Sequence, residues 1–532
     1  MTAGATFATA CRSSHLTRPN AKNATLVVAM CLLGSLLAAR PAASETRPNI
    51  IFITTDDMRV RDLQAMPNVA ALLSDKGMTF TASYAPFPLC CPARAAWVTG
   101  QYNHNNGVMG NESSTHPSPA YSALDATNTV ATWLRGAGYQ TAFVGKYLNG
   151  YGSVKPVVVP PGWVEWHASV AGGNYFYTKL RENTGGVLST RTYDGPYQVD
   201  LYNDIATSII RRRVPATEPL FLWVSFYAPH GGAPAEADDP SISTPAVPPR
   251  WKDYYASAPL PKDANFSEAD VSDKPAYVRS KTLVTATMQA KLKESNAQRW
   301  ESLRAVDDSV ADIVQALQAA GELDNSVIVF SSDNGWMMGE HRISTGKTVP
   351  YEESSRVPLI IRGPGFAPGA SRGQAVASID LAPTFADLAN TTPGLAVDGR
   401  SLLPLATDPA RWPTRTLVLE AGPQKLGGPD IYHGIRTDRY KYIRHSTGEV
   451  EFYDLIADPY EMRSLTNEPA YDSTQAELAA LLVKMENCAG AACQSSTTII
   501  SAASTTSPTL DPTTTPAATS SDPFEFKTPP KK

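Results

Sequence analysis

Polar residues that could carry out chemistry follow four separate apolar runs of the sequence. Each run is short, and each leads into acidic, basic or amide side chains: Ile50–Ile53 into Asp56 and Asp57, Phe143–Gly145 into Lys146, Phe221–Tyr227 into His230, and Val327–Phe330 into Asp333 and Asn334. In open α/β sheets, ligands bind at the carboxyl ends of the strands. Any one of these pairs is often only a turn or a helix cap. Their joint occurrence predicts one site at one edge of a sheet.

Four of these residues form a ligand set made of oxygen alone. The carboxylates of Asp56, Asp57 and Asp333 and the amide of Asn334 suit a hard divalent cation. Past the N-terminal segment, the chain has no cluster of Cys and His with the spacing of a zinc site. We expect Ca²⁺, with Mg²⁺ as the alternative, because several protein oxygens suit the larger and more flexible calcium shell.

Strand-like and helix-like segments alternate through the middle of the chain and must position these residues. The pattern predicts strands at 49–55, 141–144, 220–227, 327–331 and 358–362, and helices at 66–76, 130–136, 200–212 and 300–320. Such alternation favours an α/β fold with a mostly parallel sheet covered by helices on both faces.

The pattern changes from residue 416 onward. Short strand-like runs at 418–420, 432–436, 440–444 and 451–455 are separated by tight turns, one of them at Thr447-Gly448. A helical stretch that includes 468–485 follows. We expect a second, smaller α+β lobe built on an antiparallel sheet.

The two ends of the chain differ in composition from the rest. Arg12, Arg18 and Lys22 precede the apolar run Ala24–Ala39, so residues 1–44 are predicted to be a signal peptide, with an uncleaved anchor helix as the alternative. No later stretch is long and apolar enough to span a membrane. The tail at 494–532 is rich in Ser, Thr and Pro, and we expect it to be disordered. The protein is expected to be secreted or extracytoplasmic, in a periplasm, a lysosome or outside the cell.

Four cysteines remain after the predicted leader. Cys488 and Cys493 lie close enough in sequence for a local disulfide in an oxidising compartment, whereas Cys90 and Cys91 are adjacent and left unpaired. The N-glycosylation pattern, which predicts a glycoprotein but is common by chance, occurs at Asn111, Asn265 and Asn390.

The segment around Cys90 resembles a known family signature. Residues 88–100, Pro-Leu-Cys-Cys-Pro-Ala-Arg-Ala-Ala-Trp-Val-Thr-Gly, are similar to the sulfatase pattern Cys-x-Pro-(Ser/Ala)-Arg followed by Thr-Gly. The segment lies between Asp56-Asp57 and Asp333-Asn334-Gly335 in the order that sulfatases show, and the resemblance covers nearly all of residues 47–480. It implies that Cys90 is oxidised to formylglycine (3-oxoalanine) by a formylglycine-generating enzyme.

Within the sulfatases, the chain resembles the branch of the N-acetylglucosamine-6-sulfatases and extracellular heparan endosulfatases. The segments that carry this likeness are Cys90–Pro92, Tyr102–Asn105 and Gly145–Asn149. Arylsulfatases have a histidine where this chain has Leu148. The role of that histidine must therefore be absent here or supplied by another residue such as His104. The long basic domain of the endosulfatases is missing, which favours an exo-acting enzyme.

The resemblance also implies a fold and a set of roles. It implies an alkaline-phosphatase-like catalytic domain at 47–415 with the smaller lobe at 416–490. The cation would be held by Asp56, Asp57, Asp333, Asn334 and the matured Cys90, whose hydrate would attack sulfur and later expel sulfate. Arg94 and Lys146 would steady the hydrate, Lys347 would contact sulfate, and His230 would protonate the leaving oxygen. Each also has a structural alternative: an ion pair for Arg94, a solvated loop for Lys347 and a capped turn for His230. The roles of His104 and His341 stay open.

Composition narrows the function classes. The chain has 46 Lys and Arg against 51 Asp and Glu, so there is no basic excess that would indicate nucleic acid as a partner. The favoured class is a hydrolase that removes sulfate from a sulfated sugar, of glucosamine-6-sulfate type, or from an aryl sulfate. The alternatives are a phosphodiester or phosphonate hydrolase of the same superfamily and a non-catalytic binder of sulfated glycans.

Overall fold

A computed structural model describes residues 47–111, 120–153, 156–171, 173–423 and 430–494. The predicted signal peptide at 1–44 lies outside these residues, as does all but the first residue of the predicted tail at 494–532.

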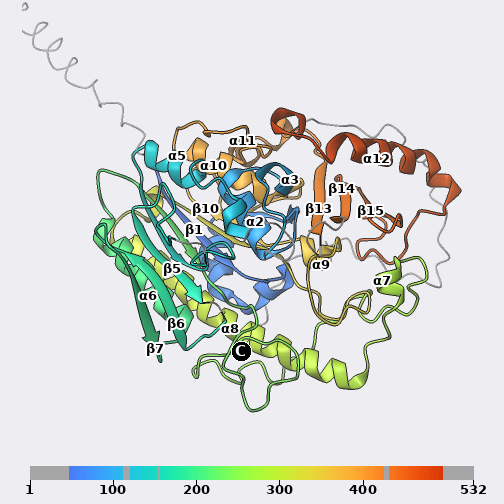
Figure 1. The fold of residues 1–532 in the computed structure, drawn as a ribbon, viewed down its shortest axis with the longest axis horizontal. Coiled ribbons are helices and arrows are strands. Elements are labelled where there is room, and N and C mark those ends of the chain that lie inside the picture. Colours follow the sequence, from blue (N-terminus) through green and yellow to red (C-terminus); the bar gives the residue numbers. More distant parts are fainter. Residues whose placement is uncertain (1–46, 112–119, 154–155, 172, 424–429, 495–532) are drawn as a thin grey trace, which may run out of the picture. The chain divides into compact units, whose positions relative to one another are not determined.

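A ten-stranded sheet forms the centre of the described chain (Figure 1). Its middle strand, β1 (Asn49–Thr55), runs parallel to β8 (Leu220–Ser225) on one side and to β9 (Ser326–Ser332) on the other. β4 (Gln140–Gly145) extends the parallel part beyond β8. Because these four strands point the same way, the residues that follow them emerge at one edge of the sheet. The prediction of a mostly parallel α/β sheet is confirmed.

Both margins of the sheet contain antiparallel strands. β5 (Glu165–Ala171) continues the parallel part, and β6 (Tyr177–Asn183) and β7 (Leu188–Asp194) form a hairpin after it. Past β9 lie β10 (Leu359–Arg362), antiparallel to it, then β2 (Met78–Phe80) and β11 (Ala370–Arg372). The apolar pattern did not predict β6 and β7, because neither strand is buried on both faces.

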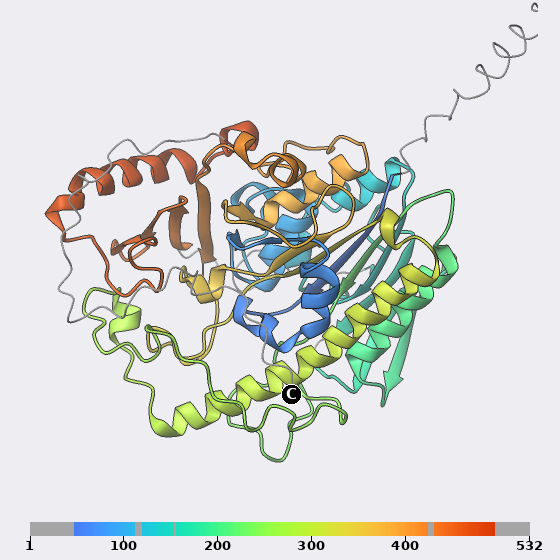
Figure 2. The same cartoon turned by 180° about the vertical axis from the view of Figure 1, so that it is seen from behind.

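Helices cover both faces of the sheet. α2 (Cys90–Thr99), α5 (Val130–Gly136) and α10 (Leu381–Leu388) pack on one face. α6 (Gln198–Arg213) and α8 (Ala286–Ala319) pack on the other, where α8 runs obliquely along the sheet (Figure 2). Alternate residues of the parallel strands join the two cores, so every residue of β1 is buried.

Two helices differ from their predicted form. The helix expected at 300–320 begins at Ala286, because the Oγ1 of Thr285 accepts a hydrogen bond from the backbone N–H of Met288 and caps a polar first part that no apolar stripe marks. The segment expected as an α-helix at 66–76 is wound as a π-helix over Val69–Ser74, and Asp75 N–H donates to the carbonyl of Ala70 at 2.9 Å. Among the described residues, none of the helices combines the length and apolar composition needed to cross a bilayer.

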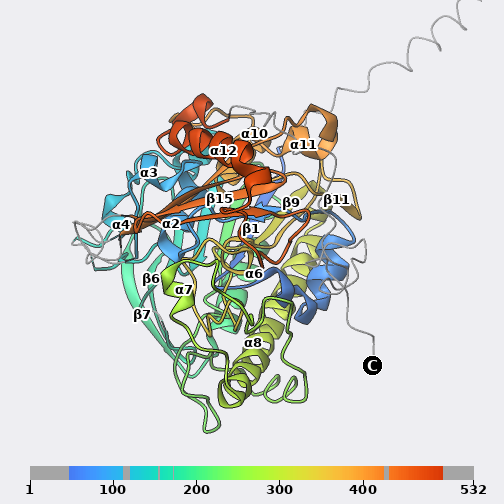
Figure 3. The same cartoon turned by 90° about the vertical axis from the view of Figure 1, so that its right-hand side faces the viewer.

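A separate four-stranded antiparallel sheet follows, as the sequence predicts. It consists of β13 (Leu417–Pro423), β14 (Asp430–Arg436), β15 (Tyr440–His445) and β16 (Val450–Asp454). α12 (Asp472–Met485) lies against this sheet (Figure 3) and buries Leu478, Leu482 and Met485 on it. The same core includes Tyr84 and Tyr102 of the larger part, so the proposed boundary between 415 and 416 stays a prediction.

The remaining elements are short. They are the helices α3 (Asn103–Asn106), α4 (Ala120–Ala123), α7 (Ala276–Arg279), α9 (Glu352–Ser355) and α11 (Leu403–Thr407), the 3₁₀ turns at Val60–Ala65, Leu323–Asn325, Ser378–Asp380, Pro409–Arg411, Pro469–Tyr471 and Gly490–Ala492, and the paired strands β3 (Ser83–Tyr84) and β12 (Val376–Ala377).

Candidate active site

Cys90 is the first residue of α2. Leu89 precedes it in an extended conformation (φ −151°), and Pro92 is tolerated in the first turn because its missing N–H has no intrahelical partner there. The helix ends at Gly100, whose φ of 70° lies in the left-handed region. Cys90 is buried, so its sulfur faces the interior at the edge of the sheet and not bulk water.

The ends of β1 and β9 bring the acidic residues together. The backbone N–H of Asp57 donates to Asp333 Oδ1 at 3.1 Å, and the Asn334 amide donates to Asp57 Oδ1 at 2.7 Å. Asp57 has a φ of 68°, a conformation that non-glycine residues seldom adopt and that clusters at functional sites. Cys90 Sγ lies 3.4 Å from Asp56 Oδ1.

Arg94 lies one turn after Cys90 on α2 and is fully buried. Its Nε donates to Asp333 Oδ2 at 2.9 Å, and its Nη2 lies 3.3 Å from Asp56 Oδ2. Its Nη1 donates to the Lys146 carbonyl and to Ser225 Oγ, both at 2.6 Å. The guanidinium therefore ties the ends of β1, β4, β8 and β9 to the helix that begins with Cys90.

Two lysines and a histidine complete the cluster. Lys146 pairs with Asp56, and Lys347 pairs with Asp57 while its Nζ lies 2.8 Å from Cys90 Sγ. His230 Nδ1 donates to the Gly231 carbonyl at 2.8 Å, which leaves Nε2 facing Asp57 Oδ2 at 3.7 Å. The three side chains are 12–28% exposed, whereas those of the aspartates are at most 1% exposed, so the cations lie between the buried acids and solvent.

Burial and charge set the ionisation of the cluster. Burial alone would raise the pKa of Asp56, but Lys146 and the other nearby cations outweigh it and lower that pKa. The pKa of Asp57 is also lowered despite its burial, chiefly by the charge of Lys347. Burial and the charge of Asp56 raise the pKa of the Cys90 thiol to about 11. An unmodified Cys90 is thus a thiol at neutral pH, and a thiol is a weak nucleophile.

The acidic residues fit a divalent cation. One carboxylate oxygen from each of Asp56, Asp57 and Asp333 lies within 4.8 Å of the others. The side-chain carbonyl oxygen of Asn334 is buried among them without a hydrogen-bond partner. Buried polar atoms are seldom left without partners, and a hard cation with oxygen ligands would satisfy this one.

Several residues at the site were not among those predicted from the sequence. The Tyr227 ring lies 5.2 Å from Lys146 Nζ, and the Trp336 ring lies 5.8 Å from Lys347 Nζ. Arg299, from the middle of α8, donates to the carbonyls of Asp57 and Pro229. Tyr227 ends the strand predicted at 220–227 and Trp336 follows the one predicted at 327–331, so both could have been suspected, whereas a helix pattern shows nothing about where Arg299 points.

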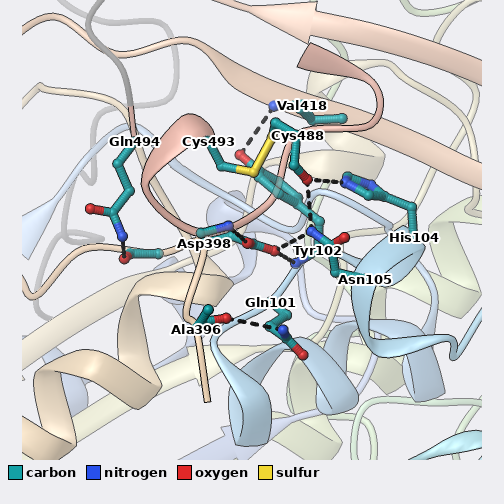
Figure 4. Close-up of a disulfide and its surroundings, with 12 residues drawn as sticks. Gln101, Tyr102, His104, Asn105, Ala396, Asp398, Val418, Cys488, Cys493 and Gln494 are labelled. Carbon is teal, nitrogen blue, oxygen red and sulfur yellow. Dashed lines mark hydrogen bonds between the residues drawn. A yellow bond between two sulfur atoms is a disulfide. The ribbon is translucent and has the colours of Figure 1, made fainter. Parts of the chain in front are cut away.

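The structure places His104 away from this cluster. Its Nδ1 lies 2.8 Å from Glu420 Oε2 and its Nε2 lies 2.9 Å from the carbonyl of Cys488, beside the disulfide between Cys488 and Cys493 (Figure 4). Both ring nitrogens of His104 already have partners, so His104 does not take the role of the histidine that arylsulfatases have at the position of Leu148. The disulfide, which the spacing of the two cysteines allows, is present.

His341 is also a buried structural residue. Its Nδ1 lies 2.6 Å from Glu268 Oε2, and its ring stacks on Tyr351 at 4.2 Å. Burial lowers the pKa of His341 to about 3, so the ring is neutral.

One glycosylation pattern is incompatible with the fold. Asn265 is fully buried and its amide donates to Glu353 Oε1 at 2.7 Å, so it cannot carry a glycan in the folded protein. Asn111 uses its Oδ1 to accept from the backbone N–H of Cys91, and Asn390 is exposed.

Known proteins share this architecture. Residues 48–391 match the sulfatase family, and residues 339–488 match the C-terminal region of N-sulphoglucosamine sulphohydrolase. Human N-acetylglucosamine-6-sulfatase is 32% identical over 402 residues, which cover 73% of this chain and 70% of that protein. The extracellular sulfatase SULF-1 homolog of Drosophila melanogaster is 34% identical over 72% of this chain, but the chain spans only 34% of that protein.

A solved structure agrees with this assignment of the fold. BT4656, in complex with its substrate D-glucosamine-2-N,6-O-disulfate, superposes with a TM-score of 0.69 at 24% identity, over 83% of this chain and 97% of that chain. The match to the family description covers more than half of the sequence, and the ten-stranded sheet with its antiparallel lobe is the corresponding fold. The chain belongs to the sulfatase family of sulfuric ester hydrolases.

Proposed function

We propose that this protein is a secreted sulfatase that removes sulfate from a sulfated sugar of the glucosamine-6-sulfate type. The observation that carries the proposal is the position of Cys90, whose sulfur lies 2.8 Å from Lys347 Nζ and 3.4 Å from Asp56 Oδ1 where four strand ends meet. Relatives named N-acetylglucosamine-6-sulfatase support the sugar class.

Two groups would complete the site. Asp56, Asp57, Asp333 and Asn334, together with the matured Cys90, would hold Ca²⁺, which when bound supplies Lewis-acid polarisation of a sulfate oxygen. Cys90 would be converted by a formylglycine-generating enzyme to formylglycine, which supplies a hydrated aldehyde as the nucleophile.

The chain's own cations would bind and orient the sulfate group. Lys347 and Lys146 line the exposed side of the acids and would neutralise the charge of the non-bridging oxygens. Arg94, held by four hydrogen bonds, would position Asp56 and Asp333 without touching the substrate. His230 is the most exposed of these groups, and its Nε2 would deliver a proton to the leaving sugar oxygen.

The disulfide supports the proposed location. Disulfides form and persist in oxidising compartments and are rare in the cytosol. The bond between Cys488 and Cys493 therefore agrees with the leader predicted at residues 1–44.

Two measurements on protein secreted by its native host test the proposal. Mass spectrometry of the peptide that contains Cys90 should show an aldehyde in place of the thiol. The same preparation should release sulfate from glucosamine-6-sulfate, lose this activity with a calcium chelator, and recover it better with Ca²⁺ than with Mg²⁺.

Matched substrates separate the alternatives. Faster turnover of a phosphodiester or phosphonate than of the corresponding sulfate ester would move the assignment to phosphorus chemistry. Binding of sulfated sugar without any sulfate release, from protein with an unmodified Cys90, would indicate a glycan-binding protein instead.

A further inference from the structure

Arg299 reaches the active site from the middle of α8, the long helix on one face of the sheet (Figure 2). Its side chain is buried, and its guanidinium makes two contacts at the site. Nη2 donates to the carbonyl of Asp57, and Nη1 donates to the carbonyl of Pro229 at 3.3 Å. Pro229 directly precedes His230, so one side chain holds the backbone beside two residues of the site.

The two carbonyls belong to segments that follow neighbouring strands. Asp57 follows β1 and Pro229 follows β8, and these strands are parallel and paired. Asp57 has a φ of 68°, a strained conformation that needs support from its surroundings. Both donating nitrogens belong to one rigid, planar group, so the carbonyls cannot move apart without losing a hydrogen bond. The guanidinium of Arg299 therefore fixes the position of Asp57 relative to His230, whose Nε2 lies 3.7 Å from Asp57 Oδ2.

Arg299 is itself held in place by its neighbours. Its Nη2 lies 3.4 Å from Asp62 Oδ2, and its guanidinium carbon lies 5.8 Å from the centre of the Trp336 ring. Asp62 also pairs with Arg59 at 2.6 Å and accepts from Trp300 Nε1 at 2.9 Å. Because Asp62 keeps these two partners, removing the guanidinium of Arg299 leaves no buried carboxylate without a partner.

We propose that Arg299 is a positioning residue for sulfate hydrolysis, which holds Asp57 in its cation-binding orientation and His230 where Nε2 can reach the leaving oxygen. Arg299 acts through these two residues, since its guanidinium donates to protein carbonyls and pairs with Asp62. The inference rests on the proposed function, which gives Asp57 and His230 their roles.

Two variants of Arg299 test the proposal. Arg299→Met removes both donors, and kcat for an alkyl sulfate should fall roughly 10–100-fold, the scale seen when a partner outside the first ligand shell is lost. The fall should be smaller for an activated aryl sulfate, whose leaving oxygen needs less help from His230. Arg299→Lys keeps the charge but has a single nitrogen, so it should restore only part of the loss.

Calcium binding gives a readout that needs no turnover. In calorimetric titration of chelator-treated protein with Ca²⁺, Arg299→Met should raise Kd about tenfold, because Asp57 is less well oriented. Unchanged kcat and Kd in both Arg299 variants would overturn the proposal. If the wild type releases no sulfate but its Ca²⁺ binding is weakened by Arg299→Met, the support of Asp57 stands and the proposed function fails.

A double-mutant cycle isolates the part of the effect that passes through His230. In the His230→Ala background, Arg299→Met should lower kcat for the alkyl and the aryl ester by the same factor, because the proton donor is already absent. A larger loss on the alkyl ester in that background would overturn the role of Arg299 in placing His230.

Arg304 is the matched control on the same helix. It donates to Asp307 Oδ2 at 2.8 Å and its guanidinium carbon lies 4.4 Å from the centre of the Trp251 ring. Arg304→Met should leave kcat and the Kd for Ca²⁺ unchanged, with kcat expressed per folded molecule from urea unfolding of each variant. Equal losses in Arg299→Met and Arg304→Met would show a general effect on α8 and overturn the proposal.

Discussion

Two buried clusters in this protein both pair lysine with carboxylates, but they have different roles. In the first, at the sheet edge, Lys146 and Lys347 pair with Asp56 and Asp57. In the second, between the two sheets, Lys441 Nζ lies 2.9 Å from Glu352 and 2.7 Å from Glu461.

The two clusters differ in access. Lys441 is fully buried and also donates to the Pro350 carbonyl at 2.9 Å, so it joins the small sheet to the loop after Lys347 and faces no opening. The lysines of the first cluster are partly exposed, and Asn334 keeps an unpartnered carbonyl oxygen. Buried charge alone therefore does not mark a site. A functional site is marked by charged groups that solvent can reach and that lie beside polar atoms without hydrogen-bond partners.

Removal of the nucleophile should give the largest effect. Cys90→Ala is expected to lower kcat for sulfate release by roughly 10⁴-fold or more, the scale seen when a covalent nucleophile is lost. The measurement is sulfate release with glucosamine-6-sulfate. Cys91→Ala, at the adjacent buried cysteine, is the matched control and should keep activity. Equal losses in both variants would show that packing of α2, and not the chemistry of residue 90, was measured.

A substitution in the second cluster, that of Lys441, should lower the stability of the fold. Lys441→Met leaves Glu461 without its cation and Glu352 with the more distant Arg436, at 3.7 Å, so the free energy of unfolding in urea should fall by about 3–5 kcal/mol. The kcat of the molecules that remain folded should not change. Lys484→Met, at an exposed position, should stay within about 0.5 kcal/mol of wild type. If Lys441→Met lost kcat but kept the full free energy of unfolding, the second cluster would belong to the active site.

The leaving-group role of His230 can be tested with two esters. His230→Ala should reduce kcat by roughly 10²–10³-fold for an alkyl sulfate, whose leaving oxygen needs a proton, and much less for an activated aryl sulfate. The kinetic comparison is made on the same protein preparation. Equal losses on both esters would assign His230 to binding instead of proton transfer.

The smallest effect should come from His104, which lies beside the C-terminal disulfide (Figure 4). Burial opposes its charged form, but the hydrogen bond to Glu420 and its charge raise the pKa of His104 to about 9. Because this folded value lies above the usual value near 6.5, the stabilisation is complete below about pH 6.5 and is lost as the pH rises through about 9.

For this partly exposed group we expect about 1–2 kcal/mol of unfolding free energy. The measurement is the difference in unfolding free energy between wild type and His104→Gln from pH 6 to pH 10. A difference that stays constant over this range would mean that His104 does not carry the charge.

Much of the fold and of the site could be predicted because the signals are local. Apolar runs such as Ile50–Ile53 are buried on both faces, and only a parallel sheet covered by helices buries both. The polar residues that follow those runs then share one edge, which brings Asp56, Lys146 and Asp333 together. The likeness of residues 88–100 to the sulfatase signature identified Cys90.

Other features had no local signal. The first part of α8 and the hairpin of β6 and β7 are exposed, so burial leaves no pattern there. The positions of Arg299 and Trp336 depend on how distant segments pack. His104 could not be excluded from the site until Glu420 and Cys488, more than 300 residues away, were seen to occupy its ring nitrogens.

The sequence by itself determined the class of fold, the small antiparallel lobe and the residues gathered at the sheet edge, because each depends on a short-range pattern or on strand direction. Only the tertiary structure decided which buried charges face an opening and which are sealed. It also excluded Asn265 as a glycan acceptor and placed His104 beside the disulfide between Cys488 and Cys493. These outcomes depend on packing between segments far apart in the chain, and packing density and access to solvent are properties that no local pattern encodes.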